Sequence, residues 1–172
     1  MIERGRIRRP LPIRLNPLGE SHMNYFLLEP DVPFGLGDAA EFDQNPAAVV
    51  KGVRSFTRID LVLWEVPAAD LTTIQGVYLM SLPLASSLQG FTGLRKAPFT
   101  LSFEPQMFEL GAFEGESLPG LVCFEVTGTV ATADFAHAAD APGLIVTEPV
   151  LRHLEGFNLD GCTVRPYTSP AR

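Results

Sequence analysis

The sequence is poor in the residues that build covalent or metal-linked frameworks. Among 172 residues it has two cysteines, three histidines and one tryptophan. Cys123 and Cys162 show no metal-ligand spacing and are too few for a disulfide framework. Both lie in apolar stretches, which favours buried, reduced thiols in a cytoplasmic protein. No apolar run approaches the roughly 20 residues that span a bilayer, so we expect no membrane partner.

Basic residues are the scarcer charge. Lysine and arginine total 13 against 20 aspartates and glutamates, for a net charge of −7. Five of the arginines lie within residues 1–22 beside only two glutamates, so the rest of the chain is more acidic still. An acidic body repels nucleic acid and favours a basic protein partner.

Residues 1–22 differ from the rest of the chain, because they are rich in arginine and proline and show no hydrophobic period. They lack the continuous apolar core and cleavage site of a signal peptide. We predict a disordered leader over 1–22 and a single domain over 23–172. Codons for Gly19 and Glu20 can spell a ribosome-binding site ahead of Met23, which favours Met23 as the natural start. A nucleic-acid or membrane arm is the alternative for 1–22.

Motifs for catalysis are also missing. There is no Gly-x-Ser-x-Gly turn, and Gly35-Leu36-Gly37 lacks the third glycine and the lysine of a phosphate loop. We therefore expect no enzyme, no cofactor and no metal. One metal-like spacing exists, since Asp134, His137 and Asp140 would share one face of a helix. A small ligand- or metal-binding domain, or an enzyme using these three residues, is the alternative.

The best-defined stretch is 144–167, which predicts a strand, a capped helix, a turn and a strand. Thr147 is expected to cap the helix with its hydroxyl, and Glu148 places negative charge at the positive helix end. Pro149 suits the first turn, and Gly156 can end the helix in the left-handed conformation.

The same pattern occurs earlier in the chain, which predicts an internal strand–helix–strand repetition of 79–100 and 145–168. Ser81 takes the place of Thr147 as the cap. The other matched positions are Pro83 with Pro149, Leu88 with Leu154, and Gly90-Phe91 with Gly156-Phe157.

The remaining chain alternates short apolar runs with turn residues. We predict strands over 23–29, 53–64, 72–80, 99–103 and 121–126. Residues 30–37 are expected to form a loop, 38–42 a loop or one helical turn, and 133–139 a short helix. Strands and helices do not alternate strictly, so the predicted fold class is α+β: a mixed or mostly antiparallel sheet with two or three short helices.

The C-terminal stretch resembles the closing segment of a family of bacterial immunity proteins encoded beside polymorphic toxin genes. The resemblance lies in PGLIVTE at 142–148, Leu151, Leu154, the Leu159-Asp160-Gly161 turn and Arg165-Pro166. It implies inhibition of a cognate toxin by binding, with no catalytic residues to carry over. An adaptor subunit of a secretion system is a further alternative.

Two acidic segments with aromatic residues are the candidate binding surfaces, because interfaces combine aromatic anchors with a charged rim. The first comprises Glu104, Phe108, Glu109, Phe113, Glu114 and Glu116, and the second includes Asp38 and Glu41. Acidic charge would speed encounter with a basic toxin domain. The alternative is that the phenylalanines belong to the core and the glutamates are merely solvated.

Overall fold

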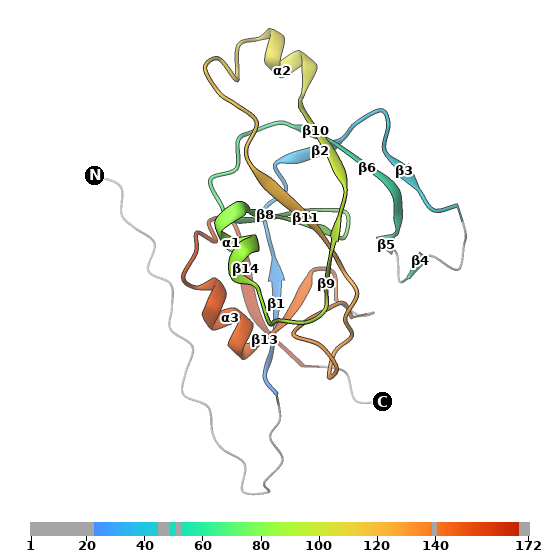
Figure 1. The fold of residues 1–172 in the computed structure, drawn as a ribbon, viewed down its shortest axis with the longest axis vertical. Helices are drawn as coiled ribbons and strands as arrows, with labels where there is room; N and C mark the ends of the chain where they lie inside the picture. The colour runs from blue at the N-terminus through green and yellow to red at the C-terminus, as the bar shows by residue number, and fades with distance from the viewer. Residues whose placement is uncertain (1–22, 45–48, 51–52, 139–140, 169–172) are drawn as a thin grey trace, which may run out of the picture.

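The computed structural model describes residues 23–44, 49–50, 53–138 and 141–168, so the predicted disorder of 1–22 lies outside the described residues. The described part contains three four-stranded sheets and three short helices (Figure 1). A separate hairpin pairs β4 (Val49–Val50) with β5 (Val53–Arg54). The strand pairings are mostly antiparallel, and the predicted α+β class is confirmed.

One sheet forms the first of two similar units. It contains β7 (Leu71–Ile74), β8 (Val77–Ser81), β9 (Leu94–Ala97) and β11 (Leu121–Val126), with α1 (Leu82–Ser87) following β8 directly. The strand order is β7-β8-β11-β9, and each neighbouring pair is antiparallel. The strands before and after the helix are therefore held apart by a central strand, β11.

A second sheet repeats this arrangement. It contains β12 (Phe135–Ala136), β13 (Leu144–Thr147), β14 (Thr163–Tyr167) and β1 (Tyr25–Glu29), with α3 (Glu148–Leu154) following β13. The order is β12-β13-β1-β14, again antiparallel throughout. The central strand here is β1, which comes from the start of the described chain rather than from within the unit.

The two units also agree in register. Ser81 lies opposite Leu121 as Thr147 lies opposite Tyr25. At the outer pairing, Met80 lies opposite Leu71 as Val146 lies opposite Phe135. The predicted repetition is thus present, and it extends beyond the predicted ranges to an outer and a central strand on each side.

Helices α1 and α3 bring the two units together around one core. The buried side chains Leu84 and Leu88 of α1 and Val150 and Leu154 of α3 belong to the same hydrophobic cluster. Ser87 Oγ lies 2.8 Å from His153 Nε2, and these residues are 66 positions apart. The same offset relates Ser81 to Thr147, so the contact joins equivalent positions, as in an isologous dimer interface.

Two aspartates link the units reciprocally. Asp70 precedes β7 and accepts hydrogen bonds from Ser81 Oγ in its own unit, at 2.5 Å, and from the backbone N–H of Asn158 in the other, at 2.8 Å. Asp134 precedes β12 and accepts from Thr147 Oγ1 in its own unit, at 3.3 Å, and from the N–H of Thr92 in the other, at 2.9 Å. Each carboxylate therefore ties a helix start to the loop that follows the opposite helix.

A third sheet covers the outer face of the first unit. It consists of β2 (Phe34–Leu36), β3 (Glu41–Phe42), β6 (Phe56–Leu63) and β10 (Phe99–Phe103). Strands β6 and β10 run parallel, whereas β2 and β3 are antiparallel to β6. Residues from both sheets share a second core cluster: Phe34, Ile59, Leu61, Leu63, Ile74, Val77, Leu79 and Cys123.

The two helix starts differ in detail. Ser81 caps α1 as predicted, because its hydroxyl accepts from the N–H of Leu84 at 3.4 Å. Thr147 occupies the cap position of α3 but makes no side-chain cap bond, so that prediction is wrong; its hydroxyl turns to Asp134 instead. Gly156 does not adopt the left-handed conformation that we predicted, although its counterpart Gly90 does, with φ of 95°.

Four predicted elements differ from the structure. The expected single strand over 72–80 is a hairpin, because Gln75 and Gly76 turn the chain with φ of 44° and 87°. The expected loop over 30–37 contains β2, and the expected loop or helical turn over 38–42 contains β3. The helix expected over 133–139 is replaced by β12, and only residues 133–138 of it lie in the described chain.

Candidate functional site

The first predicted surface forms a projection at one end of the molecule (Figure 1). After β10 the chain enters the short helix α2 (Pro105–Glu109) and returns through a loop to β11. Glu104 caps this helix, because its Oε2 accepts from the N–H of Met107 at 2.8 Å. Glu104 therefore holds the projection in shape, in addition to contributing negative charge.

Stacked aromatic rings fasten the projection to the third sheet. Phe113 is only 4% exposed, and its ring centroid lies 4.4 Å from that of Phe103 on β10. The ring centroid of Phe108 lies 5.8 Å from that of Phe103, and Phe108 is 57% exposed. The two phenylalanines that we predicted as partner contacts therefore differ. Phe113 packs against Phe103 and anchors the segment, whereas Phe108 faces solvent.

Apolar and acidic side chains alternate on the outside of the projection. Met107, Leu110 and Leu118 are exposed with Phe108, and Leu110 reaches 81%. Glu109, Glu114 and Glu116 are exposed among them. No lysine or arginine occurs in residues 104–120. The arrangement offers apolar contact area inside a rim of one sign of charge, which suits a basic partner.

Trp64 extends this surface. The sequence pattern predicted only that Trp64 ends a strand. It directly follows β6 and is 51% exposed. Trp64, Glu65 and Val66 line a hollow together with four residues of the projection: Met107, Ala112, Phe113 and Glu116. The sequence feature that could have identified this residue is a single tryptophan followed by a glutamate at the end of an apolar run.

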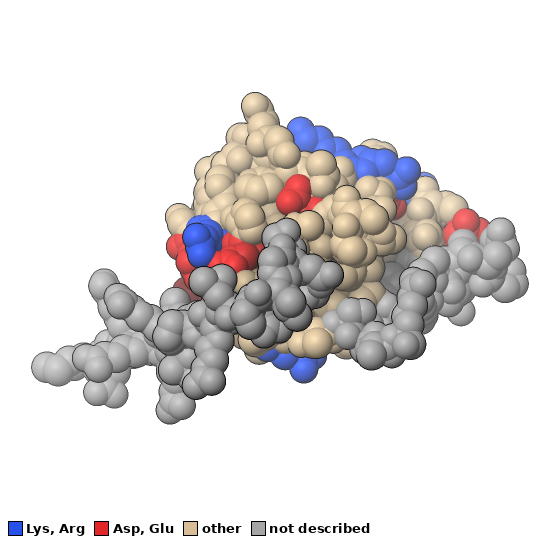
Figure 2. Space-filling view, turned by 90° about the horizontal axis from the view of Figure 1, so that it is seen from below, with Lys and Arg blue, Asp and Glu red and all other residues tan. Residues whose placement is uncertain are grey.

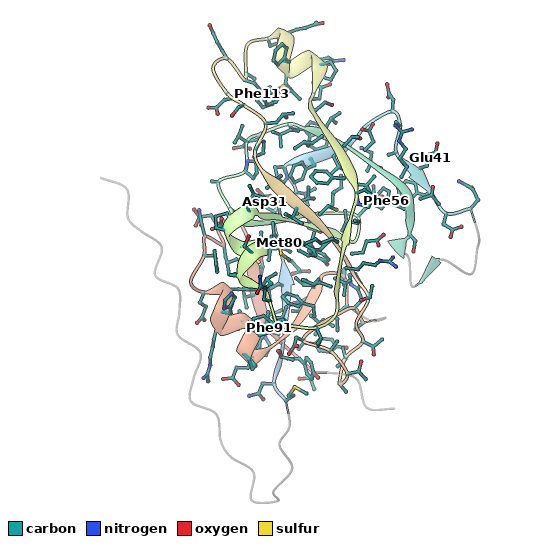
Figure 3. All side chains as sticks on the ribbon, in the orientation of Figure 1. Asp31, Glu41, Phe56, Met80, Phe91 and Phe113 are labelled. Carbon is teal, nitrogen blue, oxygen red and sulfur yellow. The ribbon has the colours of Figure 1, made fainter. Side chains whose placement is uncertain are left out.

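The second acidic segment does not join the first. Asp38 and Glu41 are exposed, and Glu41 lies opposite Arg58 near the start of β6. The projection begins at the other end of this strand, where the N–H of Glu104 donates to the carbonyl of Leu63 at 3.0 Å. At about 3.3 Å per strand residue, the two positions on β6 are roughly 16 Å apart. Figure 3 shows Glu41 and Phe113 on separate parts of the molecule.

The end of the molecule opposite α2 has a different character. Figure 2 views this end, where lysine and arginine appear as well as aspartate and glutamate on a mostly uncharged surface. Three of the basic side chains in the described chain pair with carboxylates: Arg95 with Glu125, Arg152 with Glu148, and Arg165 with Glu29. Residues 104–120 differ, because they contain four glutamates and no lysine or arginine.

The alternative metal site is not assembled by the described residues. Asp134 uses both carboxylate oxygens to join the two units, and Asp140 lies outside the described part of the chain. His137 is half-buried beside Tyr78, and its Nδ1 lies 3.3 Å from the carbonyl oxygen of Gly143. Burial lowers the pKa of His137, which favours a neutral ring. No group of metal-ligating side chains occurs in the described ranges.

Other ionisable groups with shifted pKa values have structural explanations. Burial raises the pKa of Cys123 to about 12 and that of Cys162 to about 11, so both thiols are held in the protonated, unreactive form. Hydrogen bonds from Asn24 and Arg152 lower the pKa of Glu148 at the start of α3. These groups lie apart from the projection, so none of them adds chemistry to it.

The chain matches no protein-family model and no curated protein sequence. None of the helices in the described ranges is long and apolar enough to cross a membrane.

Proposed function

We propose that this protein is an immunity protein, which neutralises a cognate bacterial toxin in the cytoplasm by direct binding and without catalysis. The observation that carries the proposal is the projecting segment 104–120, where exposed Phe108 and Leu110 lie among glutamates with no basic residue. The resemblance of residues 142–166 to immunity proteins supports the same function.

Exposed aromatic and aliphatic side chains supply the desolvated centre of an interface, and surrounding charge sets the encounter rate. The stack of Phe103 and Phe113 holds the segment in one conformation before binding, which lowers the entropy lost on association. A toxin domain with a basic surface is the complementary partner.

The experiment pairs this protein with the toxin domain encoded by the adjacent gene. Co-expression is expected to rescue cells from the toxin, and the purified pair is expected to associate more slowly as salt rises. Replacing Glu109, Glu114 and Glu116 with lysine should slow association about tenfold or more. Stopped-flow or surface-plasmon measurements of both rate constants provide the readout.

The matched variant reverses the same number of charges at Asp38, Glu41 and Glu155, which are exposed and lie outside the projection. Asp38 and Glu41 belong to the second predicted surface, so the two variants also compare the two surfaces. Both variants change the net charge equally. If the projection binds the toxin, the second variant should slow association much less than the first. Equal slowing by both variants would assign the effect to net charge rather than to this surface. Failure of the neighbouring toxin domain to bind would refute the proposed function.

A further inference from the structure

Trp64 is an exposed aromatic residue in a fixed orientation. Its ring lies against the backbone of β2, since a Cβ atom added at Gly35 would be 2.6 Å from the indole carbon Cζ2. The backbone N–H of Trp64 donates to the backbone carbonyl of Pro33 at 3.0 Å. Only glycine at position 35 permits this close approach, so the indole is preorganised although half of it faces solvent.

Two hollows flank the chain that follows Trp64. The first, described above, lies between this chain and the projection. The second lies on the other side and is lined by side chains that include Asp31, Pro67, Thr72 and Asp160. Glu65 and Val66 line both hollows, so both hollows adjoin this short segment.

Both hollows carry charge of one sign. Asp31, Glu65, Glu116 and Asp160 are among the lining residues, and no lysine or arginine of the described chain lines either hollow. A partner segment that crosses them gains electrostatically if it is basic. The indole face adds a site where an arginine or lysine side chain can lie over the ring.

We propose that Trp64 is the central anchor of the toxin-binding surface, and that a basic segment of the toxin lies across both hollows, from Glu116 to Asp160. This inference rests on the proposed function and adds the partner chemistry and the centre of the interface. The projection and the chain around Trp64 then form one binding surface, contributed by the α2 segment, residues 64–68 and the loops that hold Asp31 and Asp160.

A direct test uses the fact that the chain has a single tryptophan. The protein labelled with 5-fluorotryptophan gives one fluorine resonance, and tryptophans of an unlabelled toxin domain stay invisible. Addition of the adjacent gene's toxin domain is expected to shift this resonance and to reduce its solvent isotope shift, because the indole becomes covered. If the complex forms, as shown by co-elution, and the resonance does not move, Trp64 lies outside the interface and this inference fails while the proposed function stands. If no complex forms, both fail.

Variants give an independent measure. Trp64→Ala is expected to raise the dissociation constant about 30-fold or more, as for a buried interface anchor. Glu65→Lys should raise it about tenfold, whereas Glu155→Lys, the matched exposed control, should change it less than about threefold. Circular dichroism and the thermal midpoint establish that each variant is folded. Wild-type affinity for both Glu65→Lys and Trp64→Ala would overturn the inference, even if the α2 charge reversals weaken binding.

Discussion

The two repeated units share one scaffold and differ in what is attached to it. In the first unit the chain passes from β9 to the central strand β11 through β10 and the α2 projection, and the third sheet covers the outer face. In the second unit the central strand β1 comes from elsewhere, and the outer face is covered by partly buried loop residues such as Val130 and Ala141. The candidate binding surface thus combines additions to the first unit, residues 64–68 and the α2 segment, with the loops that hold Asp31 and Asp160.

This difference indicates how a symmetric framework acquires one binding surface. The equivalent strands and helices are occupied with making the shared core, as Leu84, Leu88, Val150 and Leu154 show. Loops and insertions are free of that constraint and can carry exposed aromatic and acidic residues. We therefore expect changes at equivalent scaffold positions to alter stability similarly in both units, and changes in the projection to alter binding.

The largest effects are expected for the paired leucines of the shared core. Leu88→Ala and Leu154→Ala should each lower the free energy of unfolding by about 2–5 kcal/mol, because each leaves a cavity among the same buried side chains. Urea unfolding followed by circular dichroism gives these values. A single cooperative transition in both variants is expected; two separate transitions would show that the units unfold independently and do not share one core.

The next largest losses of stability are expected for the two aspartates that link the units. Asp70→Ala and Asp134→Ala should each cost about 1–3 kcal/mol, because each removes a charged acceptor that joins a helix start to the opposite loop. Asp38→Ala, an exposed aspartate outside these contacts, is the control and should cost less than about 0.5 kcal/mol. If only one of the two variants lost stability, the contacts of Asp70 and Asp134 would not be equivalent.

The smallest effects should reveal the one asymmetry between the helix starts. Ser81→Ala is expected to cost about 1 kcal/mol, because it removes the cap of α1 as well as the bond to Asp70. Thr147→Val keeps the shape of a fully buried side chain and removes only a long 3.3 Å bond, so its cost should be smaller. Chemical denaturation of both variants measures the difference, and a larger loss at Thr147 would contradict this reading of the caps.

Local signals in the sequence were sufficient for the repeated helices and most long strands. Prolines in the first turn and Ser81 at the cap predicted α1 and α3 with starts that agree with the structure. The segment 133–139 was misassigned because tertiary contacts override local preference there. Phe135 lies within an alanine-rich run that favours a helix, yet its full burial in the shared core holds it in β12.

The candidate site divides in the same way. The density of glutamate and phenylalanine in 104–116 identified the segment, but local pattern did not distinguish anchored Phe113 from exposed Phe108. Trp64 was missed because its partners, Gly35 and the α2 segment, lie far from it in the chain. Asp134 and His137 were grouped by their spacing on an expected helix, and the strand there gives them different partners.

By itself, the sequence determined the acidic character of the chain, the α+β class and the two strand–helix–strand segments. These follow from composition, hydrophobic period and capping residues, which act over a few neighbouring positions. Only the tertiary structure decided that β1 and β11 enter the two units as central strands, that Asp70 and Asp134 tie the units together, and that Trp64 lies beside the projection. Such pairings depend on which distant segments bury the same apolar surface and complete each other's backbone hydrogen bonds, and local pattern carries no record of that choice.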